Sequence, residues 1–244
     1  MARVIVDATS SASDTAFATR LEGVENMNTG LEAERSGRVG AWMGVAFVVL
    51  FVAGFMVFQT PMDNKDTVKW QRWWTDSGHR VGAVIGAYLM VLAALAFVWF
   101  MWSLYQRTRG GGGMMVTYGS LFVGLVLVSA LVRAAIPGGK QFGSVPVPSG
   151  DLARQFDNIG FGVLLVAGAL SAGAFTAVAS HLARRDALLP DWLTMAGFVV
   201  AVLQLAAGLF FPFVLFVLWV LVVSIVLLRR ESRVESRASV AVSS

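Results

Sequence analysis

Long runs of apolar residues, separated by short polar segments, dominate the chain from residue 39 onward. A helix of about twenty residues crosses the roughly 30 Å hydrocarbon core of a bilayer. Four of the runs have about this length or more, and we predict that they form transmembrane helices at 39–58, 81–105, 114–136 and 156–182. The pattern therefore predicts an all-α fold, a polytopic membrane helix bundle.

The last apolar run, residues 192–228, is too long for one span. It contains no charged residue, and Gln204 is its one strongly polar side chain. A single helix of this length would measure about 55 Å, nearly twice the thickness of the hydrocarbon core. A break near Phe211 and Pro212 gives two spans, 192–210 and 212–228, with Pro212 in the first turn, where proline is tolerated. We expect six transmembrane helices, with five as the alternative.

The positions of basic residues predict the orientation. With six spans, 12 of the 19 Lys and Arg residues lie on the side of the two termini. They are Arg3, Arg20, Arg35, Arg38, Arg107, Arg109, Arg184, Arg185, Arg229, Arg230, Arg233 and Arg237. Because basic loops remain on the cytoplasmic side, we predict that both termini are cytoplasmic. A five-span chain would place the last four arginines outside, against this rule.

Three segments follow from this topology. Residues 1–38 are polar and lack a long apolar run, which predicts a disordered cytoplasmic tail. Residues 39–229 form the six-helix transmembrane domain. Residues 230–244 form a basic, solvated cytoplasmic tail whose arginines meet the lipid headgroups.

Composition agrees with a membrane protein and limits the chemistry. The chain is 57% hydrophobic and 14% charged, with a mean hydropathy of +0.70. It has no cysteine, which excludes disulfides, thiolate nucleophiles and iron–sulfur clusters. Its two histidines, His79 and His181, are predicted at opposite ends of the bundle and cannot share a haem. We predict no cofactor, and no nucleic-acid partner because topology explains the net charge of +4.

Polar residues concentrate in the connection between the first two spans. Trp70, Trp73 and Trp74 follow one another at helical spacing, close to Lys69 and Arg72. This mixture is typical of an aromatic patch at the lipid headgroups, with a ligand-binding patch as the alternative.

Two further residues of this connection have the spacing of metal ligands. Asp76 and His79 lie three residues apart, but Asp76 or Ser77 also suits the N-cap of a helix. We expect capping, with a metal site as the alternative.

Three polar side chains fall within or at the ends of the spans. We predict an ion pair between Arg133 and Asp157 that links the third and fourth spans, with ligand recognition as the alternative. Gln204 is expected to make an interhelical hydrogen bond, with a substrate contact as the alternative. Together with Asp76 and His79, these residues are the candidate polar cluster of the outer face or membrane interior.

Glycines recur every four residues at the start of the second span. Gly78, Gly82 and Gly86 form a stripe that lets another helix approach closely, so we predict a role in helix packing.

The segment DALLPDWLTMAGFVVAVLQLAAGLFFPFVLFVLWVLVVSIVLLRR combines a Leu-Pro-x-Trp-Leu start, a small-residue middle and a late Trp-Val pair. It resembles uncharacterised six-span integral membrane proteins of high-GC bacteria, over about residues 80–228. The resemblance implies a multi-pass protein of the bacterial cytoplasmic membrane and transfers no site residue.

No hydroxyl has a base beside it in the sequence, so no nucleophile is indicated. The sequence favours a non-catalytic accessory, scaffold or sensing subunit in the lipid bilayer, associated with other membrane subunits or with copies of itself. One alternative is a small oligomeric transporter or channel with its path along the glycine-rich second and fourth spans. Another is an enzyme that acts on a lipid or quinone at the outer face through Asp76, His79 and Asp157.

Overall fold

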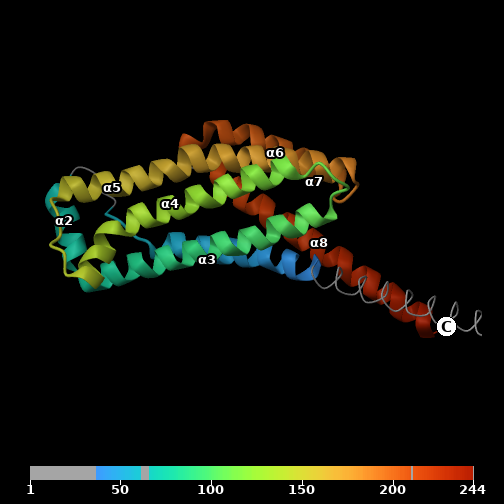
Figure 1. Ribbon diagram of the computed structural model, residues 1–244, viewed down its shortest axis with the longest axis horizontal. Coiled ribbons are helices and arrows are strands. Elements are labelled where there is room, and N and C mark those ends of the chain that lie inside the picture. The colour runs from blue at the N-terminus through green and yellow to red at the C-terminus, as the bar shows by residue number, and fades with distance from the viewer. Residues whose placement is uncertain (1–36, 62–65, 210, 244) are drawn as a thin grey trace, which may run out of the picture. The chain divides into compact units, whose positions relative to one another are not determined.

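The computed structural model describes residues 37–61, 66–209 and 211–243 (Figure 1). Every regular element in these ranges is a helix, and they contain no strand. Residues Gly40–Ser244 form one compact unit, which holds nearly all of the described chain. The predicted all-α helix bundle is confirmed. The predicted tail at 1–38 lies almost entirely outside the described residues.

Within the described residues, five helical segments are long and apolar enough to cross a membrane, so the chain is a multi-pass membrane protein in contact with the lipid bilayer. They are the first helix (Gly37–Val57), α3 (Ser77–Arg107), α4 (Gly113–Gly143), Gly150–Arg185 and Pro212–Arg230 within α8 (Phe211–Ser243). Gly150–Arg185 consists of α5 (Gly150–Gly162), the π-helix η1 (Val163–Gly168) and α6 (Ala169–Arg185).

A sixth apolar helix is shorter. It comprises α7 (Asp191–Leu203) and the start of the 3-10 helix η2 (Gln204–Leu209), and it ends at Ala206, where the backbone leaves helical φ and ψ values. In the described ranges, the full-length candidate spans therefore number five, which was the alternative to six. The break between the last two helices lies where the sequence predicted it, since α8 begins at Phe211 and Pro212 occupies its first turn. The N-cap of α7 is Pro190, with Asp191 as the first helical residue.

Two helices exceed the predicted bounds. At 31 residues each, α3 and α4 measure about 46 Å, which is longer than the hydrocarbon core. The sequence placed the end of the third span at Pro137, but α4 continues through this buried proline to Gly143. Proline removes one backbone hydrogen bond, and the packing of α4 on α3 and α5 compensates for that loss. The last helix, α8, also exceeds its predicted end, because it continues to Ser243 through the segment 230–244 that was predicted to be a tail.

Hydrogen bonds between loops bring the basic segments to one end of the bundle. The Arg185 guanidinium donates to the Gly110 carbonyl over 2.7 Å, and the Arg109 amide donates to the Asp186 carboxylate over 2.9 Å. Arg230 of α8 donates to the carbonyl of Leu188 in the α6–α7 loop over 2.6 Å. We call this the basic end. The opposite end carries α2 (Thr67–Thr75), which contacts α3 and α5, and we call it the α2 end (Figure 1).

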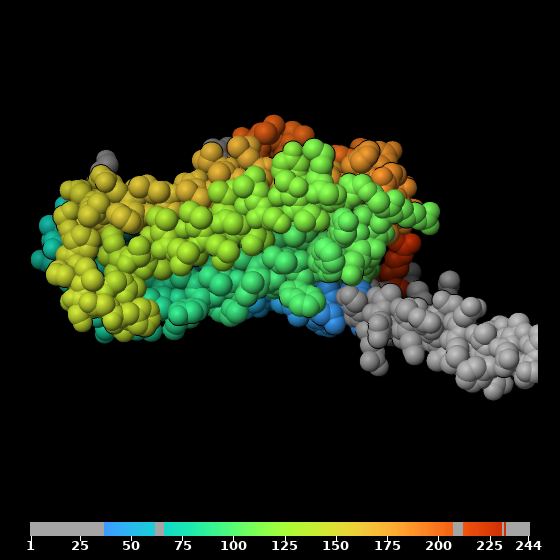
Figure 2. All heavy atoms as spheres, viewed as in Figure 1, coloured from blue at the N-terminus to red at the C-terminus, as the bar shows by residue number. Residues whose placement is uncertain are grey.

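Phenylalanine side chains fill the centre of the bundle. Seven of those in the described residues are at most 2% exposed, and they come from the first helix, α3, α4, α6 and α8. Their rings pair at centroid distances of 5.0 to 6.3 Å, mostly tilted or edge-on, which is the favoured geometry of aromatic pairs. The seven are Phe47, Phe97, Phe100, Phe122, Phe175, Phe213 and Phe216. Figure 2 shows the outer surface that α3, α4 and α5 form on one face around this core.

Glycines bring the first helix and α3 into close contact. A Cβ atom at Gly86 would lie 2.8 Å from the Phe58 Cβ and 2.9 Å from the Gly54 carbonyl oxygen. A Cβ at Gly82 would meet the Val57 carbonyl at an ordinary 3.5 Å, and one at Gly78 would approach only the side chain of Asp76. Gly86 and, less closely, Gly82 therefore have the predicted packing role, and Gly78 does not.

Candidate functional site

A buried ion pair links α4 to α5 near the α2 end. The Arg133 Nε donates to the Asp157 Oδ1 over 2.7 Å, and the two residues are only 7% and 8% exposed. A side chain at Gly160 would collide with the Arg133 Cγ, so the absence of a side chain there lets Arg133 lie across α5. The predicted Arg133–Asp157 pair is confirmed.

Aromatic rings cover the guanidinium of this pair. The Arg133 Cζ lies 4.1 Å from the ring centroid of Phe58 and 5.6 Å from that of Phe161. Both distances are within the range of cation–π attraction. The Arg133 charge is therefore balanced by Asp157 and contacted by two rings, so the protein itself surrounds the ion pair.

The three tryptophans of α2 have two different environments. Trp70 and Trp74 are 2% and 1% exposed and pack with Phe58, because α2 lies against α3 and α5 and turns these two residues inward. Trp73 is half-buried, and its indole stacks on His79 with centroids 3.5 Å apart. The prediction of one aromatic patch at the lipid headgroups is therefore wrong for Trp70 and Trp74, whose rings belong to the protein core.

Asp76 is the N-cap of α3. Its Oδ1 accepts the backbone N–H of His79 over 3.0 Å and also lies 3.3 Å from the His79 Nδ1. The His79 backbone N–H is the main cause that lowers the pKa of Asp76, with smaller contributions from the charges of His79 and Arg80. The predicted capping role is confirmed. In the described residues, no group of three His, Cys, Asp or Glu side chains is placed to hold a metal ion.

Gln204 lies apart from the ion pair. Its Nε2 donates to the Pro212 carbonyl in the first turn of α8 over 2.6 Å, so the predicted interhelical hydrogen bond is present. Gln204 packs on Gly173 of α6. A Cβ atom added at Gly173 would lie only 2.8 Å from the Cβ of Gln204. Gly173 follows Asp157 by sixteen residues in one continuous helical segment, which is about 24 Å.

The predicted polar cluster therefore divides into three separate places. Asp76 and His79 cap α3, Arg133 and Asp157 join α4 to α5, and Gln204 joins η2 to α8. The three residues proposed for an outer-face enzyme are not free to act together, because Arg133 binds the carboxylate of Asp157.

Two hollows at the α2 end were not predicted from the sequence. The first, which we call the groove, has a volume of about 220 Å³ and is lined by Phe51, Val52, Phe55, Met56, Leu164, Phe213, Val214 and Val217. The second, which we call the mouth, has a volume of about 490 Å³ and is lined by Phe55, Met56, Gln59, Thr60, Pro61, Lys69 and Trp73. No motif marks them. The walls of the groove come from three segments far apart in the chain, and those of the mouth come from the end of the first helix, the residues that follow it and α2.

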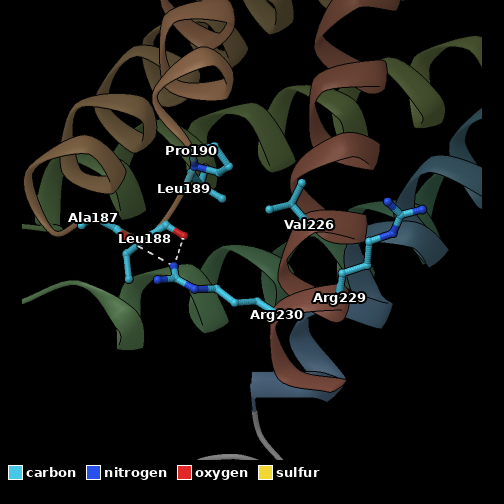
Figure 3. Close-up of a pocket in the computed structure, with 7 residues that line it drawn as sticks. All are labelled: Ala187, Leu188, Leu189, Pro190, Val226, Arg229 and Arg230. Atoms are coloured by element: carbon cyan, nitrogen blue, oxygen red, sulfur yellow. Dashed lines mark hydrogen bonds between the residues drawn. The ribbon is translucent and has the colours of Figure 1, made fainter. Parts of the chain in front are cut away.

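A third cavity, of about 440 Å³, lies at the basic end between the α6–α7 loop and α8 (Figure 3). Arg230 spans it and donates to the carbonyls of Ala187 and Leu188 over 3.2 and 2.6 Å, whereas Arg229 points to another side of α8 (Figure 3). In the same loop, the side chain of Arg185 lowers the pKa of Asp186 through a hydrogen bond. Arginines at this end thus tie loops and helix together.

In comparisons of the chain with protein-family models, curated proteins and solved structures, none matched. The resemblance to six-span bacterial proteins therefore stays a prediction, and the geometry carries the functional argument.

Proposed function

We propose that this protein is a non-catalytic accessory, scaffold or sensing subunit of a bacterial cytoplasmic membrane. One observation carries the proposal: the charged residues buried deepest in the described helices, Arg133 and Asp157, bind each other at 2.7 Å under the rings of Phe58 and Phe161. Ionisable groups that serve transport usually face a water-filled path or a substrate. Arg133 and Asp157 instead hold two helices together.

The centre of the bundle supports the same proposal. A solute path along the bundle axis would have to displace the packed rings around Phe97 and Phe122. The buried hydroxyls of Ser171, Thr176 and Ser224 donate to carbonyls of their own helical segments, so they need no water. These contacts favour a structural role over a transporter or channel.

The ends of the bundle are then the surfaces for interaction. We infer that the basic end faces the cytoplasm, because Arg109, Arg185 and Arg230 gather there. The α2 end faces outward in this orientation. A partner subunit or a second copy of the chain would dock at these ends or along the exposed side chains of the helices.

The test is purification of the full-length protein in a mild detergent, followed by native mass spectrometry and solute-flux assays in proteoliposomes. The proposal predicts a complex of fixed stoichiometry, with a second membrane protein or with further copies of the chain, and no flux above protein-free vesicles. A monomer that conducts ions or small solutes would contradict it and would support the transporter alternative.

A further inference from the structure

The groove and the mouth lie next to each other, because Phe55 and Met56 of the first helix line both of them. We call the two together the joined hollow. The mouth alone, at about 490 Å³, has the size of a small-molecule site. The joined hollow thus has an apolar part, the groove, and a polar part, the mouth.

The groove lies where three helical segments meet. It is lined by residues of the first helix, among them Val52, by residues of α8, among them Val214, and by Leu164 of the π-helix η1. All eight lining residues are hydrocarbon, aromatic or thioether side chains, which suits an acyl chain.

Among the described residues, one charged side chain lines the mouth. It is Lys69, and its ammonium has no ion pair within the same part of the chain. Gln59 and Thr60 add an amide and a hydroxyl. Trp73 forms a fixed wall, because its Nε1 donates to the Gln59 carbonyl over 3.3 Å and its ring stacks on His79. A cationic, hydrogen-bonding mouth above an apolar groove is complementary to an amphiphile with a negative head.

We propose that the joined hollow binds one anionic phospholipid, with an acyl chain in the groove and the phosphate at Lys69. A basic side chain next to the membrane surface attracts anionic lipid, and the groove beside it orders one chain of that lipid. This site does not depend on the accessory role of the protein. It would be present in a scaffold, in a sensor or in a transporter.

The head contact is tested with full-length protein in nanodiscs of equal phosphatidylglycerol and phosphatidylcholine, by native mass spectrometry of the lipids that stay bound. Wild type is expected to retain phosphatidylglycerol in preference by about fivefold. Lys69→Gln abolishes this preference. The matched control is Lys140→Gln, since Lys140 is a half-buried lysine of α4 that does not line the hollow, and it keeps the preference.

The chain contact is tested by filling the groove. Val52 and Val49 are both exposed residues of the first helix, at 43% and 60%, but only Val52 lines the groove. Val52→Trp is expected to reduce the total bound lipid, and Val49→Trp is expected to leave it unchanged. Thermal unfolding of both variants checks that each is folded.

Three outcomes would overturn the proposal. The first is a wild-type protein without preference between the two lipids. The second is an equal preference in the Lys69→Gln and Lys140→Gln variants. The third is an increase in unfolding temperature with free glycerol 3-phosphate as large as with phosphatidylglycerol, which would assign a simple anion site. None of these outcomes bears on the partner and flux experiments above.

Discussion

The centre of the bundle and its α2 end use aromatic residues in opposite ways. In the centre, Phe97 and Phe122 pack ring against ring with centroids 5.0 Å apart and leave no polar group between them. At the α2 end, Phe58 covers a charged guanidinium, and Trp73 stacks on an imidazole beside an open mouth. Aromatic side chains thus seal one region of this protein and shape a polar surface in the other.

The largest effect is expected from breaking the ion pair at the α2 end. Arg133→Met leaves the buried carboxylate of Asp157 without its partner, so we expect a loss of about 3–5 kcal/mol in the free energy of unfolding. The measurement is denaturant unfolding in detergent. The double variant Arg133→Met, Asp157→Leu is the control, because it removes both charges and restores most of the stability. A double variant as unstable as the single one would show that the pair itself is essential.

A somewhat smaller loss is expected in the centre. Phe97→Ala removes a fully buried ring that contacts five other phenylalanines, which costs about 3 kcal/mol of unfolding free energy. Trp99→Ala, on the same helix but 59% exposed, is the matched control with little expected loss. Equal free energies of unfolding for the two alanine variants would contradict the stabilising role of the buried rings in the centre.

The smallest effect is expected at the N-cap of α3, and it depends on pH. Because folding lowers the pKa of Asp76, its ionised form stabilises the native state above the unfolded pKa of about 3.9. This stabilisation is lost as the pH falls through the lower pKa of the folded protein. Thermal unfolding between pH 7 and pH 3 measures it.

Two variants separate the charge of Asp76 from its capping bond. Asp76→Ala lowers the unfolding temperature at pH 7, whereas Asp76→Asn keeps most of the capping and loses its contribution to the acid dependence. If both variants lose stability between pH 7 and pH 3 as wild type does, other carboxylates cause the acid dependence.

Local signals in the sequence predicted much of the fold. Apolar length located the spans, the Pro212 break divided the last run, and the aspartate before α3 marked its cap. The Arg133–Asp157 pair was also predictable, because two lone charges at the facing ends of neighbouring spans require partners.

Features that depend on tertiary packing could not be read from the chain. Nothing local tells that α4 continues past Pro137, or that Trp70 and Trp74 turn toward the protein instead of the lipid. The groove also escaped prediction, since Met56, Leu164 and Val214 line one hollow only after the bundle has formed. Spacing within a single helix carries no information of this kind.

Cysteine labelling shows whether the interior of the bundle is sealed and whether its two ends are open to water, and it is straightforward here because the chain has no cysteine of its own. Single cysteines would replace Ala93 and Ala172, which are 0% exposed, Thr75 at the α2 end and Gln106 at the basic end. A membrane-impermeant maleimide, added to intact cells and then to opened cells, reports which positions water reaches.

We expect Thr75→Cys to react in intact cells, Gln106→Cys to react only after the cells are opened, and Ala93→Cys and Ala172→Cys to stay unlabelled in both. Labelling of Ala93→Cys or Ala172→Cys in the folded protein would reveal water inside the bundle and contradict the account.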